Sequence, residues 1–227
     1  MDNLLSNLKI NVSDSLYQID PATSKLGKKI IINSVEMIVA LGFEKFTFKK
    51  LGEVIGSPEA SIYRYFKSKN QVLSYLISWY WGWMEYRLVF ETSNIPSAEI
   101  RLEKSIALVS SNVIDKLSIE GIEIIKLHQI IISESIKSYL TKDVDKANKE
   151  GAFLNYKKFV ERISKIIHEI NPKYKYPHML LTTIIEGAHL QVFFGQHLPH
   201  LTNKQKSPDY VTKFYTSLAQ QSIKGKL

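Results

Sequence analysis

Residues 46–71 constrain the fold most, because their sequence, FTFKKLGEVIGSPEASIYRYFKSKNQ, predicts two short helices joined by a tight turn. Thr47 can cap the first helix with its hydroxyl group. Apolar residues recur behind it at helical spacing: Phe48, Leu51, Val54 and Ile55. Gly56 supplies the permissive backbone that ends a helix. We therefore expect a helix over residues 48–55 that buries one apolar stripe.

A second helix should begin directly after this turn. In the run Ser57-Pro58-Glu59 the serine can cap, the proline suits the first helical position because it has no amide hydrogen, and the glutamate faces the positive helix end. Ile62 and Phe66 form a buried pair at a spacing of four. Ser68 and Gln71 have the spacing of a capping box, which predicts the start of a further helix.

Two helices joined in this way can place the second one in the major groove of DNA. An ordinary helical hairpin has the same pattern, so the charge distribution matters. Residues 24–70 contain nine lysines and arginines and four glutamates, a net charge of +5, whereas all 227 residues have a net charge of +8. This concentration of positive charge favours a surface that faces phosphate groups.

These residues resemble a known family. The stretch GFEKFTFKKLGEVIGSPEASIYRYFKSKNQVL, preceded by KKIIINSVEMIVAL, is similar to the DNA-binding region of the tetracycline-repressor (TetR) family of bacterial transcription regulators. The resemblance covers about residues 25–76 in register. It includes the Gly42-Phe43 turn, the threonine and glycine described above, the run Ser61-Ile62-Tyr63, Phe66 and Ser68-Lys69.

The second helix departs from the family pattern near its start. Glu59 and Ala60 stand where the family commonly has a basic residue followed by glycine, and Ser57 replaces a residue that is usually apolar. Phosphate would repel a carboxylate here, although a cytosine amino group could donate to it. Glu59 therefore either reads a base or only stabilises the helix start, and no specific operator follows from the sequence.

The resemblance and the charges together predict which residues contact DNA. The expected base readers are Ser61 and Arg64, and the expected phosphate contacts are Thr47, Lys50, Tyr63 and Lys69. The full predicted set is Thr47, Lys49, Lys50, Ser57, Glu59, Ala60, Ser61, Tyr63, Arg64, Lys67 and Lys69.

The rest of the chain shows helical periodicity and no period-two strands, so we expect an all-α fold of about nine helices. The expected further helices cover about residues 25–41, 69–91, 97–116, 121–140, 144–171, 177–198 and 207–224. We expect an N-terminal extension over 1–23, a three-helix helix-turn-helix domain over 24–70, and a ligand-binding and dimerisation domain over 71–227. The extension lacks the clustered basic residues of a minor-groove arm, so we expect a loosely ordered tail.

The helix expected over 69–91 is rich in aromatic residues. In the resembled family this helix links the DNA-binding unit to the regulatory domain and moves when an inducer binds. Trp79, Trp83 and Tyr86 share one helical face, which could line a pocket or belong to the core. His128 and Glu186 are polar residues on otherwise apolar helices, and they could orient a ligand or form core hydrogen bonds. Such a pocket suggests a small hydrophobic or aromatic ligand.

The last two expected helices carry apolar sides that could form half of a four-helix dimer bundle or be buried within one monomer. The family resemblance implies the homodimer. A two-fold dimer would place two recognition helices about 34 Å apart, matching a pseudo-palindromic operator in double-stranded DNA.

Several classes of protein do not fit the sequence. The chain has no cysteine, which excludes disulfides and thiol chemistry and suits a cytoplasmic protein. No apolar stretch approaches the roughly 20 residues that span a bilayer, and no signal-peptide pattern is present, so we expect no membrane association. The six histidines form no zinc pattern, and no glycine-rich phosphate loop or nucleophile elbow occurs. We therefore expect that the protein binds no metal ion and no cofactor, and that it is not an enzyme.

The sequence thus predicts a DNA-binding transcriptional regulator, most simply a repressor that a small molecule releases from its operator. The alternative is a helical dimeric adaptor for protein interactions that binds DNA without sequence preference. Glu59 is the only residue that supports this alternative.

Overall fold

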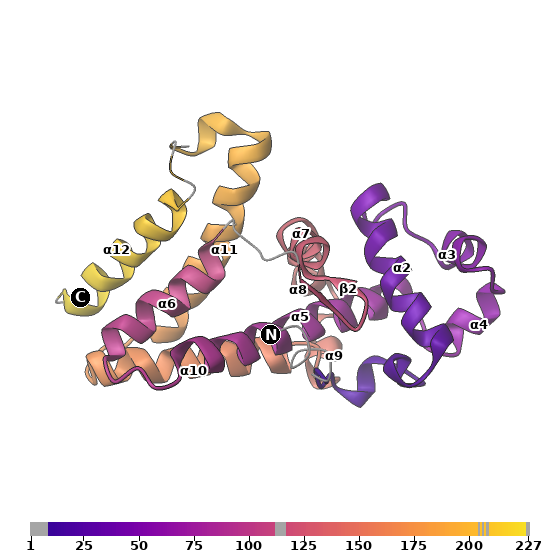
Figure 1. Cartoon of the computed structure of the whole chain (residues 1–227), viewed down its shortest axis with the longest axis horizontal. Helices are drawn as coiled ribbons and strands as arrows, with labels where there is room; N and C mark the ends of the chain where they lie inside the picture. The colour runs from indigo at the N-terminus through magenta and orange to yellow at the C-terminus, as the bar shows by residue number, and fades with distance from the viewer. Residues whose placement is uncertain (1–8, 112–116, 204, 206, 208, 226–227) are drawn as a thin grey trace. The chain divides into compact units, whose positions relative to one another are not determined.

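The computed structural model describes residues 9–111, 117–203, 205, 207 and 209–225, and most of these residues are helical (Figure 1). The helices are α2 (Lys25–Leu41), α3 (Phe48–Ile55), α4 (Glu59–Tyr63), α5 (Lys69–Thr92), α6 (Ala98–Ser110), α7 (Ile124–Glu134), α8 (Ile136–Tyr139), α9 (Val144–Lys149), α10 (Leu154–Ile170), α11 (Pro177–His197) and α12 (Tyr210–Lys224). Short 3-10 helices are η1 (Asp14–Leu16), η2 (Pro21–Thr23) and η3 (Pro199–Leu201), and the strands are β1 (Ser118–Ile119) and β2 (Ile122–Glu123). The predicted all-α fold is confirmed.

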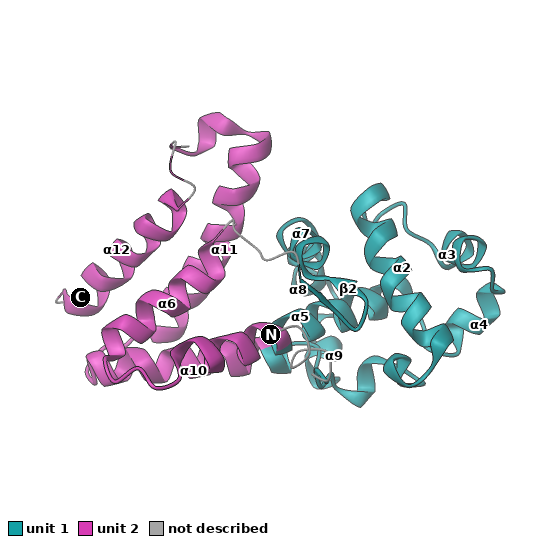
Figure 2. Ribbon diagram, in the orientation of Figure 1, with its two compact units in different colours: residues 1–82, 114–155 teal, residues 83–113, 156–227 magenta. Residues whose placement is uncertain are grey.

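The chain packs into two compact units (Figure 2). The first combines residues 1–82 with 114–155, and the second combines 83–113 with 156–227. Both α5 and α10 begin in the first unit and continue into the second. The units describe packing alone, so the functional boundary expected after residue 70 remains a prediction.

Capping residues end α2 and α3 at the boundaries that the sequence predicts. Thr47 Oγ1 accepts a hydrogen bond from Lys50 N at 3.3 Å, and Gly56 ends α3 in the left-handed conformation with φ of 67°. Phe48 and Leu51 are buried as expected. The prediction for Val54 is wrong, because its side chain is 59% exposed. The buried stripe of this short helix is therefore narrower than the apolar pattern suggests.

α4 begins at Glu59, one residue later than predicted, with Pro58 as its N-cap residue. The predicted cap by Ser57 is wrong, because Ser57 still belongs to the turn that ends α3 and its N donates to Gly52 O at 3.0 Å. Ile62 is fully buried, as predicted. The next helix, α5, starts at Lys69 as the capping box predicts.

Residues within 9–23 bind distant parts of the chain, so the prediction of a loose tail is wrong for this segment. Gln18 N donates to Tyr65 O at 2.8 Å, just beyond α4. Asn155 Nδ2 donates to Asn11 O at 2.9 Å. Leu16 is 1% exposed. Residues 1–8 lie outside the described residues, so the loose tail expected there stays a prediction.

Residues with positive φ delay the start of one predicted long helix and divide another into two. The helix expected from residue 121 begins at Ile124, because a turn with positive φ at Glu120 (52°) and Gly121 (86°) joins β1 to β2 in an antiparallel hairpin. The prediction of a chain without strands is wrong at this hairpin. The helix expected over 144–171 is split into α9 and α10, because Gly151 has φ of 81°.

Aromatic residues along α5 are buried on several sides, as a helix apolar all round requires: Tyr75, Trp79, Tyr80, Trp81 and Trp83. In the second unit, α11 packs against α6 and α12. α12 buries one side, made of Val211, Tyr215, Ala219 and Ile223. Among the described residues, no helix has the length and apolar character that a bilayer crossing requires.

Candidate nucleic-acid interface

α4 presents one side to solvent and one side to the core. Its exposed side chains are Glu59, Ala60 and Tyr63, followed by Arg64 at the C-cap position. Glu59 and Tyr63 are four positions apart, as are Ala60 and Arg64, so each pair lies along one side of the helix and the two pairs are adjacent. Ser61 is only half-buried, so it lies at the edge of this face. The structure thus brings together most of the residues predicted to face DNA on this helix.

Gly52 sets how closely α3 approaches the following turn. A Cβ atom at this position would lie 2.6 Å from Ser57 O, which is closer than side chains pack against backbone. The sequence reasoning overlooked Gly52. Its signal is a glycine inside a short helix, which costs about 1 kcal/mol relative to alanine and therefore points to a packing requirement.

The start of α3 lies beside the exposed face of α4. The Tyr63 ring packs edge-on against Phe48 with ring centroids 5.0 Å apart, and 49% of Tyr63 remains exposed. Lys49 is exposed, and Lys50 Nζ donates to Lys45 O at 3.0 Å. Three of the four residues predicted to contact phosphate, Thr47, Lys50 and Tyr63, therefore come from α3, including its N-cap, and α4, which pack against each other.

Lys69 differs from the other predicted phosphate contacts. Its Nζ donates to Phe43 O (3.1 Å) and Glu44 O (3.0 Å) and lies 4.8 Å from the centre of the Phe43 ring. These contacts fasten the start of α5 to the turn between α2 and α3. An ammonium group has three hydrogens, so one remains for another acceptor. Lys67, by contrast, is exposed.

Ion pairs neutralise two of the four glutamates in residues 24–70. Glu36 pairs with Lys126 of α7 at 2.6 Å, and Glu44 pairs with Lys137 of α8 at 3.1 Å. The hydrogen bond to Glu36 raises the pKa of Lys126 above its usual value. Sequence reasoning missed both lysines, because they lie outside the helix-turn-helix segment and only the fold brings them near it.

A buried carboxylate links α7 to the same turn that Lys69 holds. Glu134 is 7% exposed, accepts from Phe43 N at 3.4 Å and pairs with Lys137 at 2.8 Å. The hydrogen bond to Glu134 raises the pKa of Lys137. The backbone of the turn is therefore bound from one side by α5 and from the other by α7.

The five residues predicted to contact a ligand differ in their exposure and in the side chains that they contact. Trp83 and Tyr86 stack with centroids 6.2 Å apart and an interplanar angle of 16°, with Tyr86 42% exposed. Trp79 is 1% exposed. His128 Nδ1 hydrogen-bonds Tyr80 OH at 2.8 Å, a partner that the sequence did not reveal. Glu186 Oε1 accepts from the Tyr156 hydroxyl at 3.4 Å.

Comparison with known proteins identifies the family of the helix-turn-helix segment. Residues 30–76, which contain α3, α4 and most of α2, match the family model described as bacterial regulatory proteins, tetR family. Residues 30–76 therefore carry the DNA-binding segment of the TetR family. The predicted resemblance is thereby confirmed over these residues. No curated protein matches the sequence of the chain.

Solved structures share the fold of this chain over most of their length. A protein from Saccharomonospora viridis described as a transcriptional regulator, in complex with choline, has a TM-score of 0.61 and 16% identity, covering 87% of this chain and 97% of that one. AibR in complex with isovaleryl coenzyme A and operator DNA has a TM-score of 0.54 and 14% identity, covering 84% and 97%. FadR from Bacillus subtilis in complex with stearoyl-CoA has a TM-score of 0.52 and 17% identity, covering 88% and 98%.

Among the described residues, no group of three or more histidine, aspartate or glutamate side chains is arranged to hold a metal ion. The histidine on α11 that is most buried, His189, is 5% exposed, and burial lowers its pKa to about 4. It is therefore a neutral residue of the core at neutral pH.

Proposed function

We propose that this chain is a homodimeric repressor of the TetR family that leaves its operator when a small molecule binds. The observation that supports DNA recognition best is the exposed face of α4, where Arg64 is exposed and the Tyr63 ring packs against Phe48, the residue before the lysines at the start of α3. A face of this kind can enter the major groove while the lysines contact the flanking phosphates.

Arg64 and Ser61 are the proposed base readers, and Thr47, Lys50 and Tyr63 are the proposed phosphate contacts. An arginine can donate two hydrogen bonds to one guanine, which makes Arg64 the stronger source of sequence preference. Lys69 has a double role in this proposal, because its ammonium group already binds two backbone carbonyls. It would position the start of α5 and offer its remaining hydrogen to a phosphate.

The dimer is proposed to form through α11 and α12. Apolar side chains remain exposed on these helices: Met179 (67%), Leu190 (39%), Phe214 (59%) and Leu218 (38%). Such residues favour association with another apolar surface. A two-fold dimer would let two copies of α4 contact successive major grooves on one side of the DNA.

The ligand is proposed to be a small hydrophobic or aromatic molecule that contacts α5. Trp83 and Tyr86 stack within the second unit and would supply an aromatic surface, and Glu186 of the same unit would supply a polar group for orientation. The complexes of the structural neighbours with choline, isovaleryl coenzyme A and stearoyl-CoA support a ligand-binding role for this fold.

α5 is the proposed route from ligand to DNA. Its start is fastened to the turn before α3 by Lys69, and its later residues include the aromatic candidates. A ligand that binds one arrangement of α5 more tightly shifts the population toward that arrangement. The two copies of α4 would then no longer match both half-sites.

Selection from random duplexes across a salt series tests this proposal. A regulator should enrich a pseudo-palindrome whose half-sites lie about one helical turn, roughly 34 Å, apart. The competing proposal, an adaptor without operator specificity, rests on the exposed carboxylate of Glu59 at the start of α4. An adaptor should retain a pool without any preferred sequence, with strong salt dependence. That second result would contradict the repressor proposal.

A further inference from the structure

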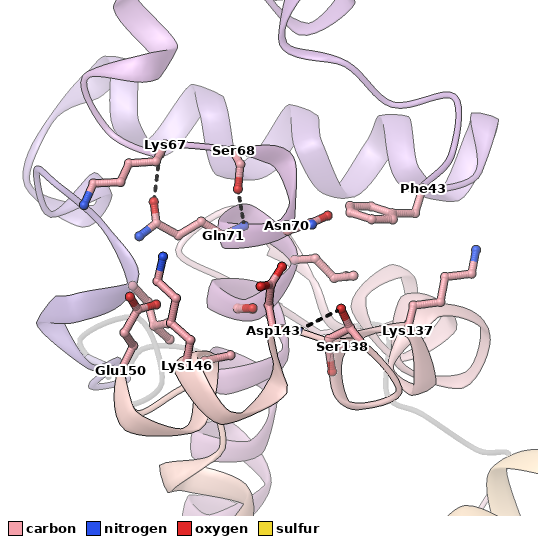
Figure 3. Close-up of a pocket in the computed structure, with 15 residues that line it drawn as sticks. Phe43, Lys67, Ser68, Asn70, Gln71, Lys137, Ser138, Asp143, Lys146 and Glu150 are labelled. Carbon is pink, nitrogen blue, oxygen red and sulfur yellow. Dashed lines mark hydrogen bonds between the residues drawn. The ribbon is translucent and has the colours of Figure 1, made fainter.

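A cavity of about 240 Å³ lies in the first unit, next to the helix-turn-helix (Figure 3). Four parts of the chain form its walls: the N-terminal segment through Leu16, the turn between α2 and α3 through Phe43, the start of α5 through residues 67–74, and the region of α8 and α9 through residues 137–150. None of the five predicted ligand contacts on α5, α7 and α11 lines it. It is therefore a separate candidate site.

Four charged side chains that line this cavity form no ion pair with any residue in the described part of the chain: Lys67, Asp143, Lys146 and Glu150. Asp143, Lys146 and Glu150 are three or four residues apart, a spacing at which opposite charges on a helix commonly pair. Lys137 also lines the cavity, but Glu134 and Glu44 already neutralise it. The unpaired charges are thus two of each sign.

The lining combines these charges with neutral polar groups and an apolar wall. Figure 3 shows Asp143 and Lys146 extending from the α9 side toward Gln71 at the start of α5, whereas Lys137 extends away from it. Asn70 and Ser74 add an amide and a hydroxyl group, and Leu73 closes an apolar side. Opposite charges, hydrogen-bonding groups and apolar surface therefore face one small space.

We propose that this cavity binds a small zwitterion of the amino-acid class. The ligand carboxylate would bind Lys146, and its ammonium group would bind Asp143 and Glu150. The balance of unpaired charges disfavours a phosphate, which the carboxylates would repel, and a simple cation, which the lysines would repel. The volume corresponds to about eight waters at roughly 30 Å³ each, which suits a free amino acid of moderate size.

Such a ligand would lie against the connection between α4 and α5. Lys67 and Ser68 belong to that connection and also line the cavity. A ligand held between it and α9 would favour one arrangement of the start of α5, and so change the affinity for DNA. The proposal of a binding site depends only on the cavity, whereas the proposed effect on DNA rests on the function proposed above.

Isothermal titration calorimetry of the full chain with the free L-amino acids tests binding. At least one is expected to bind saturably in the micromolar to low-millimolar range. For each one that binds, two analogues that keep the side chain but lack either the carboxylate or the amino group are expected to bind about tenfold or more weakly, because each loses one charge-assisted contact. Absence of saturable binding across the whole set, or equal binding of the analogues, would overturn the proposal.

Matched variants locate the site. Lys146→Met and Asp143→Asn are each expected to weaken binding about tenfold. Lys149→Met and Asp145→Asn remove the same charges from neighbouring positions that do not line the cavity, and they should leave affinity unchanged. Ser74→Leu fills the space without removing a charge and should abolish binding. Thermal unfolding of each variant shows whether it is folded, and folded cavity variants with unchanged affinity would overturn the assignment.

The effect on DNA is measured separately with the enriched duplex from the selection experiment. The amino acid that binds is expected to change the affinity for this duplex about fivefold or more in the parent protein and not in Asp143→Asn. If no duplex is enriched, the function proposed above fails while the calorimetry still decides the site. If the duplex binds but the amino acid leaves its affinity unchanged, the regulatory part of this inference is wrong.

Discussion

Arg64 is the residue whose replacement best separates sequence reading from general affinity. It is exposed at the end of α4. We predict that Arg64→Ala relaxes sequence preference at one base pair and costs about 1–3 kcal/mol on the preferred duplex, because a bidentate contact to a base is lost. Competition binding against duplexes altered at single positions measures both effects. An Arg64→Ala protein with unchanged affinity and preference would contradict the assignment.

Lys50→Ala is the matched control for Arg64→Ala, because it removes a positive charge that is predicted to contact phosphate alone. It should weaken binding to every duplex to a similar degree. The slope of log affinity against log salt should fall by about one unit. Equal behaviour of both variants would show that Arg64 contributes charge and no sequence reading.

His189 is expected to make stability depend on pH. Burial lowers its pKa from 6.5 to about 4, so the folded protein keeps it neutral while the unfolded chain takes up a proton below pH 6.5. The free energy of unfolding should therefore fall as the pH drops from 6.5 toward 4, by at most about 3 kcal/mol from this residue. His189→Leu should flatten that part of the profile in denaturant unfolding.

At the residue scale, a role could be predicted only where it depends on residues nearby in the sequence. The exposure of Arg64 follows from its spacing relative to Ile62 and Phe66, which are both fully buried. The contacts of Lys69 could not be predicted, because its acceptors belong to residues about 25 positions earlier and become neighbours only in the fold. Capping hydroxyls are visible in the sequence, whereas partners brought together by tertiary structure are not.

At the scale of elements, the close packing of the N-terminal segment against α2 requires a glycine at position 27. A Cβ atom at Gly27 would lie 2.3 Å from Pro21 O, a backbone atom that cannot move without shifting η2. We predict that Gly27→Ala lowers the free energy of unfolding by about 1–3 kcal/mol and speeds proteolysis within residues 9–23. The direction is notable because glycine to alanine inside a helix normally stabilises it by up to about 1 kcal/mol.

Gly195→Ala provides the comparison for Gly27→Ala. Its nearest neighbour would be the Tyr210 hydroxyl oxygen at 3.0 Å, the far end of a side chain that can rotate away. The substitution should be neutral or slightly stabilising in thermal unfolding. If Gly27→Ala behaved in the same way as Gly195→Ala, the N-terminal segment would not be held against α2 as the structure shows.

The elements that could be predicted are those with strong local boundaries. Ser24 and Gly42 mark α2, and Pro177 opens α11, so both helices have the expected limits. The hairpin before α7 was missed because its two-residue strands are too short to show alternation. The order of residues 9–23 was missed because it depends on hydrogen bonds to distant parts of the chain, such as the bond from Asn155 to Asn11.

At the scale of the whole molecule, the sequence predicts an apolar surface on α12 but cannot show which side the monomer itself buries. Tyr215 and Ala219 point into the second unit, whereas Phe214 and Leu218 remain exposed. The family resemblance implied dimerisation, and the structure narrows the proposed interface to the exposed side. This distinction makes the dimer testable by single substitutions.

We predict that Phe214→Glu converts the protein into a monomer that still folds. Phe214 is 59% exposed, so the substitution costs little inside the monomer, but a dimer interface would have to bury an unpaired carboxylate. Sedimentation should show the change in mass. Affinity for the two-half-site duplex should fall about 100-fold, because the advantage of binding two sites at once is lost. Leu140→Glu, which alters a 78% exposed apolar residue of the first unit, should remain dimeric. A dimeric Phe214→Glu protein with full affinity would place the interface elsewhere.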